Sequence, residues 1–334
     1  MSSNNQYNVC YKAPSNIAFI KYWGKEAKQI PMNPSISMTL DKCYTEMEIQ
    51  FTPAAKTIVK SFEFEGQQNE QFKNKIQKYL DSVSANFKEQ VELSIKSENS
   101  FPHSAGIASS ASSMAALSCC LGDFFDWNLK TSSSYARLAS GSACRSLFPK
   151  YAVWGKSLFP TSDNEYAVSF DEYDQKFEKM NDSVLIISGE TKSISSSAGH
   201  QLMNEHFYKQ GRVKQVNHHF EMMLKSMSEG DFDTFGQILE TEAMSLHALM
   251  MSGPEAFTLL KPNSLLAIDK IRSFRQDSKL PVYFTIDAGP NIHLIYPSSA
   301  ETDVRSFIDS ELKSCCENEL VIHDQIGNGP IKLK

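Results

Sequence analysis

Three features are missing from this 334-residue sequence, and each absence argues against a class of protein. No run of 18 apolar residues occurs, so we expect no membrane-spanning helix. The polar beginning, MSSNNQYNVC, lacks the apolar segment of a secretory signal. Basic residues do not exceed acidic ones, and the net charge of -6 argues against a nucleic-acid partner. We therefore expect a cytoplasmic protein that binds neither membranes nor nucleic acid.

Cysteine does not occur in a pattern that a metal site or a disulfide framework uses. The seven cysteines are an odd number, and the pairs Cys119–Cys120 and Cys315–Cys316 are directly adjacent, unlike the spacing in zinc sites. We expect free thiols in a reducing compartment and no metal held by protein side chains. The nucleotide-binding motif G-x-x-x-x-G-K-[ST] is also absent.

The apolar residues alternate in some segments and recur at helical spacing in others. Alternation predicts strands over residues 36–51 (with one turn near Asp41), 91–95, 183–188, 281–297 (two strands around a Gly-Pro turn) and 319–323. Helical spacing predicts helices over 70–83, 109–125, 134–148 (interrupted at Gly141), 200–252 (interrupted at 230–235) and 302–314. Because the two kinds of element do not alternate regularly, we expect an α+β fold. The length favours two domains, which we place at residues 1–190 and 191–334.

Residues 101–117, FPHSAGIASSASSMAAL, combine many small residues with the expected start of a helix near Ser109. Free N–H groups and the positive end of the helix dipole make a helix start a binding site for anions. Serine hydroxyls at that place add donors for phosphate oxygens. Close packing of the helix against a neighbour explains the same composition equally well, so the residues alone leave both interpretations open.

The same stretch resembles the phosphate loop of the GHMP kinase superfamily, whose pattern is roughly P-x-x-x-G-L-x-S-S-A. The matching residues are Pro102, Gly106, Ser109, Ser110 and Ala111, with Ile107 in place of leucine. Within this superfamily, the chain is most similar to the diphosphomevalonate decarboxylase family. Four segments in family order carry that resemblance: APSNIAFIKYWGK (13–25), SGSACRSLF (140–148), KSISSSAGHQ (192–201) and IDAGPN (286–291). Pro34 departs from the family pattern, which more often has a small residue there, and it leaves the exact substrate open.

The resemblance implies a two-domain GHMP kinase fold with the active site in the cleft between the domains. It implies ATP, Mg²⁺ and (R)-5-diphosphomevalonate as ligands. The products are isopentenyl diphosphate, ADP, phosphate and CO2, because the C3 hydroxyl is phosphorylated before phosphate and CO2 leave. Mg²⁺ is implied by ATP and not by any cluster of ligand residues in the sequence. Family members are usually homodimers, so we expect a homodimer.

Three residues in these segments are the candidate catalytic groups: Asp287, Lys21 and Arg145. Asp287 follows the apolar strand VYFTI and precedes Ala-Gly-Pro, where a carboxylate either orients the hydroxyl or takes its proton. The alternative is that Asp287 only begins a turn. Lys21 is suited to the substrate carboxylate or the transferring phosphate. Arg145 offers a forked donor for a carboxylate or diphosphate, although a surface salt bridge is the default for a lone arginine.

The remaining candidates are expected to hold the two anionic ligands. For the substrate they are Tyr22, Lys25, Ser142, Arg145, Ser195 and Ser196, with Lys25 the most peripheral. Ser195 and Ser196 lie in a loop that either closes over a ligand or serves as a linker. For ATP they are Ser104, Ala105, Gly106, Ala108, Ser109 and Ser110. Trp23 and His247 are expected to pack in the core.

Two other kinds of function compete with this one. A sister enzyme would decarboxylate the monophosphate or, as a mevalonate 3-kinase, would phosphorylate the hydroxyl without releasing CO2. A catalytically inactive relative would bind ATP as a regulatory module. Asp287, Lys21 and Arg145 together argue against the kinase, and Asp287 argues against the inactive relative. The monophosphate enzyme is harder to exclude, because it needs the same carboxylate chemistry.

Overall fold

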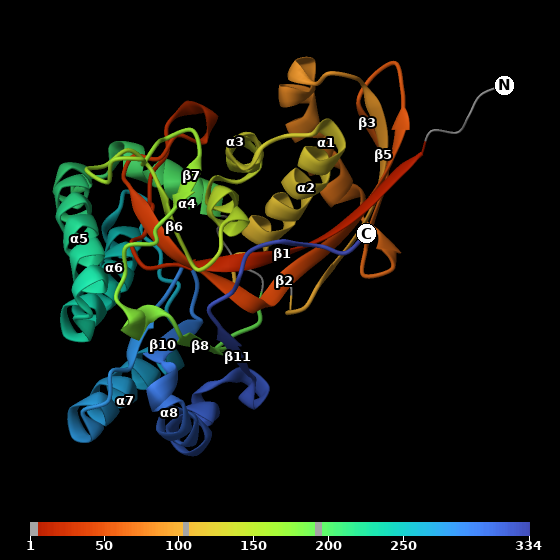
Figure 1. Cartoon of the computed structure of the whole chain (residues 1–334). Helices are drawn as coiled ribbons and strands as arrows, with labels where there is room; N and C mark the ends of the chain where they lie inside the picture. Colours follow the sequence, from red (N-terminus) through yellow and green to blue (C-terminus); the bar gives the residue numbers. More distant parts are fainter. Residues whose placement is uncertain (1–5, 103–106, 191–195) are drawn as a thin grey trace.

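The fold contains two β-sheets with helices packed against them, so the expected α+β class is confirmed (Figure 1). The computed structural model describes residues 6–102, 107–190 and 196–334, without the side chains of 196–198. Within these residues, no helix is long and apolar enough to cross a membrane.

The first sheet is built mainly from the N-terminal half. Its strands follow the order β12-β1-β2-β5-β3-β4, and β6 pairs with β2 and carries β7. Every pair is antiparallel except β3 with β5. The strands are β1 (Tyr7–Ala18), β2 (Ser35–Pro53), β3 (Ile58–Phe64), β4 (Gln67–Gln68), β5 (Val91–Asn99), β6 (Tyr151–Trp154), β7 (Ala167–Ser169) and β12 (Ile331–Lys332).

The second sheet is antiparallel, in the order β11-β8-β10-β9. Its strands are β8 (Met180–Leu185), β9 (Tyr283–Thr285), β10 (Ile292–Pro297) and β11 (Val321–Gln325). β8 precedes the domain boundary expected near residue 190, yet it pairs with two strands that follow it. β12 in turn pairs with β1 of the first sheet. The boundary near residue 190 stays a prediction.

The helices divide between the two sheets. The helices α1 and α2 contact strands of the first sheet, and α3 packs on α2; α6 and α7 contact β9 of the second, and α5 packs on α6 (Figure 1). The helices are α1 (Glu70–Val83), α2 (Ser109–Phe125), α3 (Leu129–Ala139), α4 (Ser196–Leu202), α5 (Lys209–Glu229), α6 (Phe232–Ser252), α7 (Pro262–Ser278) and α8 (Glu301–Phe307). A 3₁₀ helix (Gly141–Leu147) follows α3, and a π turn (Ile308–Leu312) follows α8. The bounds expected for α1 and α2 are confirmed.

Helices α1 and α6 begin at side-chain caps that the sequence provides. The Asn69 side chain accepts the N–H of Phe72 at 3.0 Å, which satisfies one of the free donors at the start of α1. The Asp231 side chain accepts the N–H groups of Asp233 and Thr234, both at 3.1 Å, at the start of α6. The interruption expected at 230–235 is therefore the start of α6.

The expected turn near Asp41 is wrong, because β2 continues through this position without a break. The carboxylate of Asp324 in β11 accepts the backbone N–H groups of residues 41, 42 and 43 at 2.7–3.0 Å. The pairing of β1 with β2 shifts register between Pro14 and Asn16 at the same place. A long-range contact thus holds the irregular residues inside a single strand.

One apolar cluster joins the two halves of the fold. Its members include Ile17 of β1, Met38 of β2, Val184 of β8, Phe220 of α5 and Phe235 of α6, each at most 1% exposed. A close-packed interior has low compressibility, so the elements that share this cluster keep fixed positions relative to one another. Residues that face each other above this cluster are therefore held on a common rigid base.

Candidate active site

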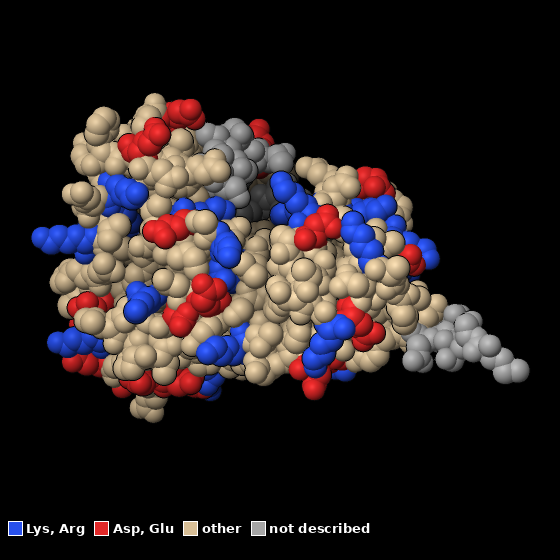
Figure 2. Space-filling model, turned by 90° about the horizontal axis from the view of Figure 1, so that it is seen from above, with Lys and Arg blue, Asp and Glu red and all other residues tan. Residues whose placement is uncertain are grey.

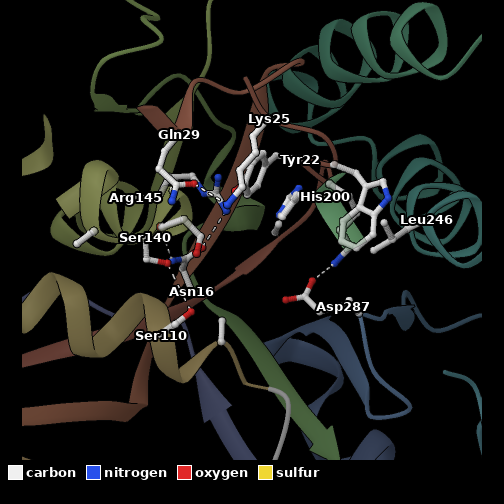
Figure 3. Close-up of a pocket in the computed structure, with 18 of the residues that line it drawn as sticks. Asn16, Tyr22, Lys25, Gln29, Ser110, Ser140, Arg145, His200, Leu246 and Asp287 are labelled. Atoms are coloured by element: carbon white, nitrogen blue, oxygen red, sulfur yellow. Dashed lines mark hydrogen bonds and ion pairs between the residues drawn. The ribbon is translucent and has the colours of Figure 1, made fainter. Parts of the chain in front are cut away.

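A cleft lies between the two halves of the fold. Its walls come from β1 and the segment after it, α1, the start of α2, the turn after α3, α4, α6 and the turn after β9. Figure 2 shows this face of the molecule hollowed near its centre, with Lys and Arg side chains on both sides of the hollow. In Figure 3, Asp287 lies on one side of the cleft and Ser110, Ser140 and Asn16 on the other, with Tyr22 and His200 between them.

Lys21 and Asp287 meet at one side of the cleft. Lys21 Nζ lies 2.7 Å from Asp287 Oδ1, and the side chains are 2% and 28% exposed. Asp287 follows β9 in a tight turn, since its carbonyl accepts the N–H of Gly289 at 2.7 Å. His247 is buried, as expected, and its Nε2 lies 3.1 Å from the same carbonyl. The turn therefore presents one carboxylate, partly open to the cleft, beside a buried ammonium group.

Arg145 is a buried cation held by neutral groups. Its guanidinium donates to Ser35 Oγ at 2.7 Å, Ser37 Oγ at 2.9 Å and Asn16 Oδ1 at 3.3 Å. Within the described part of the chain, no carboxylate lies within 4 Å of it, so the surface salt bridge considered for this residue is not formed. Burial lowers the pKa of Arg145, but arginine stays charged. A buried charge without an ionic partner is costly, and an anionic ligand in the cleft would balance it.

Tyr22 and Lys25 line the same cleft from the segment after β1. The Tyr22 ring packs edge-on against Trp154 at 4.8 Å, and burial raises the pKa of its hydroxyl, which therefore stays protonated and able to donate. A Cβ atom at Gly141 would lie 2.7 Å from this hydroxyl, so only glycine fits there. Lys25 Nζ donates to Gln29 Oε1 at 2.9 Å, and burial lowers the pKa of Lys25.

The start of α2 supports both interpretations of the small-residue stretch. Ala108 and Ser110 line the cleft, and Ser109 is the first helical residue. Ala108 has φ 46°, and none of the described side chains caps α2. A helix start without a side-chain cap favours an anionic ligand. Farther along the helix, Ala111 and Ala115 are fully buried and let α2 pack closely. Ser104, Ala105 and Gly106 lie outside the described residues.

The turn after α3 contributes Ser140, Gly141 and Ser142 to the cleft. The carbonyl of Ser142 accepts the Asn16 amide at 3.1 Å, which links this turn to β1. Ser140 Oγ lies 3.5 Å from Ser110 Oγ. The predicted substrate residue Ser142 and the predicted ATP residue Ser110 therefore lie along one wall.

His200 of α4 reaches the centre of the cleft (Figure 3). Its ring packs against Tyr22 at 4.3 Å and Trp23 at 4.7 Å, and its Nδ1 accepts the N–H of Gly24 at 3.0 Å. Burial lowers the pKa of His200 to about 3, so the ring is neutral and carries its proton on Nε2. Trp23 is buried, as expected, although it also borders the cleft. Ser195 lies outside the described residues, as does the side chain of Ser196.

Comparison with known proteins places this geometry in a family. Residues 13–165 match the model of the diphosphomevalonate decarboxylase-like N-terminal domain, and residues 183–331 match that of the mevalonate 5-diphosphate decarboxylase C-terminal domain. The diphosphomevalonate decarboxylase of Saccharomyces cerevisiae is 32% identical over 321 residues, which cover 90% of this chain and 81% of the yeast protein. The chain belongs to the diphosphomevalonate decarboxylase family.

Solved structures support the same assignment and the two-domain GHMP-type fold. Mevalonate diphosphate decarboxylase from Staphylococcus aureus has a TM-score of 0.86 at 28% identity, over 98% of both chains. The Enterococcus faecalis enzyme has a TM-score of 0.84 at 28% identity, over 98% of this chain and 99% of its own. A relative with a different printed name, phosphomevalonate decarboxylase of Haloferax volcanii, is 26% identical over 82% of this chain and 84% of its own.

A family member has been solved with the substrate MVAPP, the ATP analogue AMPPCP and magnesium. The residues of this cleft fit a metal that arrives with the nucleotide. Among the described residues, no group of three or more His, Cys, Asp and Glu side chains is placed to hold a metal ion. Asp287 is the carboxylate that lines the cleft. Mg²⁺ is commonly bound through one or two carboxylates together with substrate phosphates.

Sequence reasoning missed several residues of this cleft and its supports. Arg145 is held by Asn16, Ser35 and Ser37. These polar residues interrupt otherwise apolar strands at buried positions, a pattern that could have indicated their role. Lys75 of α1 also lines the cleft, and burial lowers its pKa. His200 was visible as an aromatic residue within KSISSSAGHQ. The position of Lys75 had no signal, because nothing in the helix pattern brings α1 to the cleft.

Proposed function

We propose that this protein catalyses the ATP-dependent decarboxylation of (R)-5-diphosphomevalonate to isopentenyl diphosphate, ADP, phosphate and CO2, in the mevalonate pathway of isoprenoid and sterol biosynthesis. One observation carries the proposal: the Lys21–Asp287 pair shares a cleft with Arg145, a buried cation with no ionic partner among the described residues. The reaction needs a carboxylate beside a hydroxyl and cations beside two strongly anionic ligands, and this cleft supplies both.

Asp287 acts on the C3 hydroxyl of the substrate. Its carboxylate, which accepts a hydrogen bond from Lys21 at Oδ1, orients the hydroxyl or accepts its proton. As the oxygen attacks the γ-phosphorus of ATP, the bond to the β,γ-bridging oxygen breaks and ADP leaves. Positioning and charge stabilisation dominate in such transfers, so little base strength is required of Asp287. Lys21 stabilises the negative charge on the transferring phosphoryl group.

Arg145 holds the substrate anion during the second stage. The C3–O bond breaks and phosphate leaves, while the electron pair of the bond to the carboxylate forms the new double bond and CO2 is released. Arg145 is fixed by Ser35, Ser37 and Asn16, so its remaining donor capacity is oriented before the substrate arrives. Tyr22 and Ser142 add neutral donors on the same wall, and Ser195 and Ser196 complete the substrate site.

ATP binds with its phosphates at the start of α2. The N–H groups at the start of a helix favour negative charge, and no described side chain caps α2. Ser104, Ala105, Gly106, Ala108, Ser109 and Ser110 form this site in our proposal. Mg²⁺ held by the nucleotide phosphates supplies charge neutralisation of the phosphoryl group during transfer.

The test is an assay of ADP and CO2 release from ATP with 5-diphosphomevalonate and, in parallel, with 5-phosphomevalonate. We expect one CO2 for each ADP from the diphosphate and little turnover of the monophosphate. Equal or better use of the monophosphate would indicate instead a phosphomevalonate decarboxylase, the activity for which the Haloferax relative is named. ADP without CO2 would indicate a kinase, and ATP binding without turnover of either substrate would indicate an inactive relative.

We further propose that the protein is a cytoplasmic homodimer, as expected from its family. Light scattering coupled to size-exclusion chromatography tests the dimer, which should elute at twice the chain mass of 37.5 kDa. Fractionation of cells from its source tests the compartment.

A further inference from the structure

The main chain of Lys21 is held by two side chains from the C-terminal half. The N–H of Lys21 donates to Glu242 Oε2 at 3.1 Å, and Arg212 Nη2 donates to the carbonyl of Lys21 at 3.0 Å. Arg212 comes from α5 and Glu242 from α6. These contacts fix the peptide groups on both sides of the Lys21 Cα atom. Asn33 Nδ2 donates to the same carbonyl at 3.1 Å.

Arg212 and Glu242 form a closed ion pair deep in the protein. Arg212 donates to both carboxylate oxygens, at 2.8 and 2.7 Å, and the side chains are 2% and 0% exposed. His219 Nδ1 lies 2.8 Å from Glu242 Oε1. Burial opposes the charge on Glu242, but its contacts with His219 and Arg212 outweigh burial and hold the pKa of Glu242 below its ordinary value.

Stability alone is a weak reason for such a pair. Removing two charges from water is costly, and apolar residues of similar volume often stabilise a protein as well or better. Two helices such as α5 and α6 would pack through apolar side chains without it. What apolar side chains would not provide is an acceptor for the Lys21 N–H and a donor for its carbonyl.

We propose that Arg212 and Glu242 are positioning residues that fix the backbone of Lys21 and thereby direct its ammonium group to Asp287 and to the transferring phosphoryl group. This inference rests on the proposed function, because it assumes that Lys21 acts in catalysis. A lysine side chain has several rotatable bonds, so its amine is placed accurately only if its backbone is fixed. Displacements of about 1 Å in an active site can cost roughly 100-fold in rate.

The chain contains a matched control on the same helix. Glu240 lies two residues before Glu242 on α6 and is also buried. It forms ion pairs with Arg272 and Arg275 of α7. Among the contacts of the described residues, none joins Glu240 to Lys21 or Asp287. Loss of Glu240 therefore removes a similar buried carboxylate without releasing the Lys21 backbone.

The experiment compares Glu242→Gln with Glu240→Gln, each alone and combined with Lys21→Met. Glutamine keeps the size of glutamate but cannot accept from Lys21, Arg212 and His219 together. Steady-state ADP release gives kcat and KM well below the unfolding temperature, and urea unfolding gives the stability of each variant. We expect both glutamines to lower stability. Only Glu242→Gln should lower kcat, by about 10- to 100-fold, with KM changed less than about threefold.

The double variants separate positioning from a purely structural role. If Glu242 acts through Lys21, Glu242→Gln has no further effect on kcat in the Lys21→Met background. An equal loss of kcat in both backgrounds, or an equal loss in the Glu240→Gln control, would overturn the inference. Normal turnover by Lys21→Met alone would overturn the catalytic role of Lys21 as well. If instead Glu242→Gln alone leaves kcat unchanged, this inference is wrong but the proposed function stays intact. If Glu242→Gln does not fold, Arg212→Lys replaces it in the same comparison, because lysine cannot contact both carboxylate oxygens of Glu242 as Arg212 does.

Discussion

Lys21 Nζ lies 2.7 Å from Asp287 Oδ1, although 266 positions separate the two residues in the sequence. Lys21 follows β1 of the first sheet, and Asp287 follows β9 of the second. The pair therefore exists only when both halves of the chain are folded and packed together. Each catalytic prediction below must accordingly be checked against folding as well as against turnover.

We expect Asp287→Asn to lower kcat by about 10²- to 10⁴-fold, the range for loss of a positioned acid–base group. Affinity for diphosphomevalonate should change little, because the amide keeps the size of the side chain. Single-turnover kinetics and equilibrium binding of the substrate measure the two effects. Asp309→Asn, at an exposed carboxylate paired with Lys313, is the control and should leave both unchanged. Turnover within threefold of the unaltered protein would refute the role of Asp287.

Arg145→Lys should raise KM for the substrate by about tenfold or more, because hydrogen bonds to charged groups contribute about 1.5–3 kcal/mol. Lysine carries the charge but lacks the fork that binds Ser35, Ser37 and a ligand together. Arg145→Ala should damage both binding and turnover. Arg137→Lys is the control, since Arg137 is equally buried but pairs with Glu165. Equal effects at both positions would indicate lost packing only.

His200 should make the folded protein less stable in mild acid. Burial lowers the pKa of His200 to about 3 from its ordinary value of 6.5, so the folded state excludes a proton that the unfolded state binds. Its contribution is present above pH 6.5 and is lost as the pH falls from there towards 3, by about 2 kcal/mol between pH 7 and 5. Urea unfolding at both values measures this loss.

His200→Gln should flatten that part of the pH dependence. His218→Gln, at an exposed position on α5, should leave the slope as it is. If stability depends on pH to the same extent in both variants, His200 is protonated in the folded state as readily as in the unfolded state, and its burial does not lower its pKa.

Asp324→Ala should destabilise the protein by about 2–4 kcal/mol, because it leaves backbone donors of residues 41–43 without their acceptor. Chemical unfolding measures the loss, and Asp309→Ala, at the exposed pair, should cost much less. KM for ATP should stay unchanged, since Asp324 does not line the cleft in the described structure. A cost no greater than that of the control would show that β2 keeps its path without this contact.

The sequence predicted best what is decided locally. The bounds of α1 and α2 follow from apolar spacing, and Asp231 marks the start of α6 by its own capping contacts. The turn expected near Asp41 was wrong because Asp324, 283 positions away, supplies the contact that keeps β2 continuous. No local pattern contains that information.

The same limit applies to the candidate site. Resemblance located Lys21, Arg145 and Asp287, and the structure brings all three to one cleft. Arg212 and Glu242 were not found, because each looks like an ordinary polar residue of an amphipathic helix. Their partner, the Lys21 backbone, lies 191 and 221 positions away and offers groups that every residue has.

The pairing of β12 with β1 has a consequence for biosynthesis. A ribosome makes residues 331–332, and the Asp324 that secures β2, after every other strand of the first sheet. The nascent N-terminal half therefore leaves the exit tunnel with one edge of its sheet unpaired and a central strand unsecured. Its last folding step waits for the C-terminal residues, and until then the edge of β1 at Tyr11 and Lys12 is open to pairing with other chains.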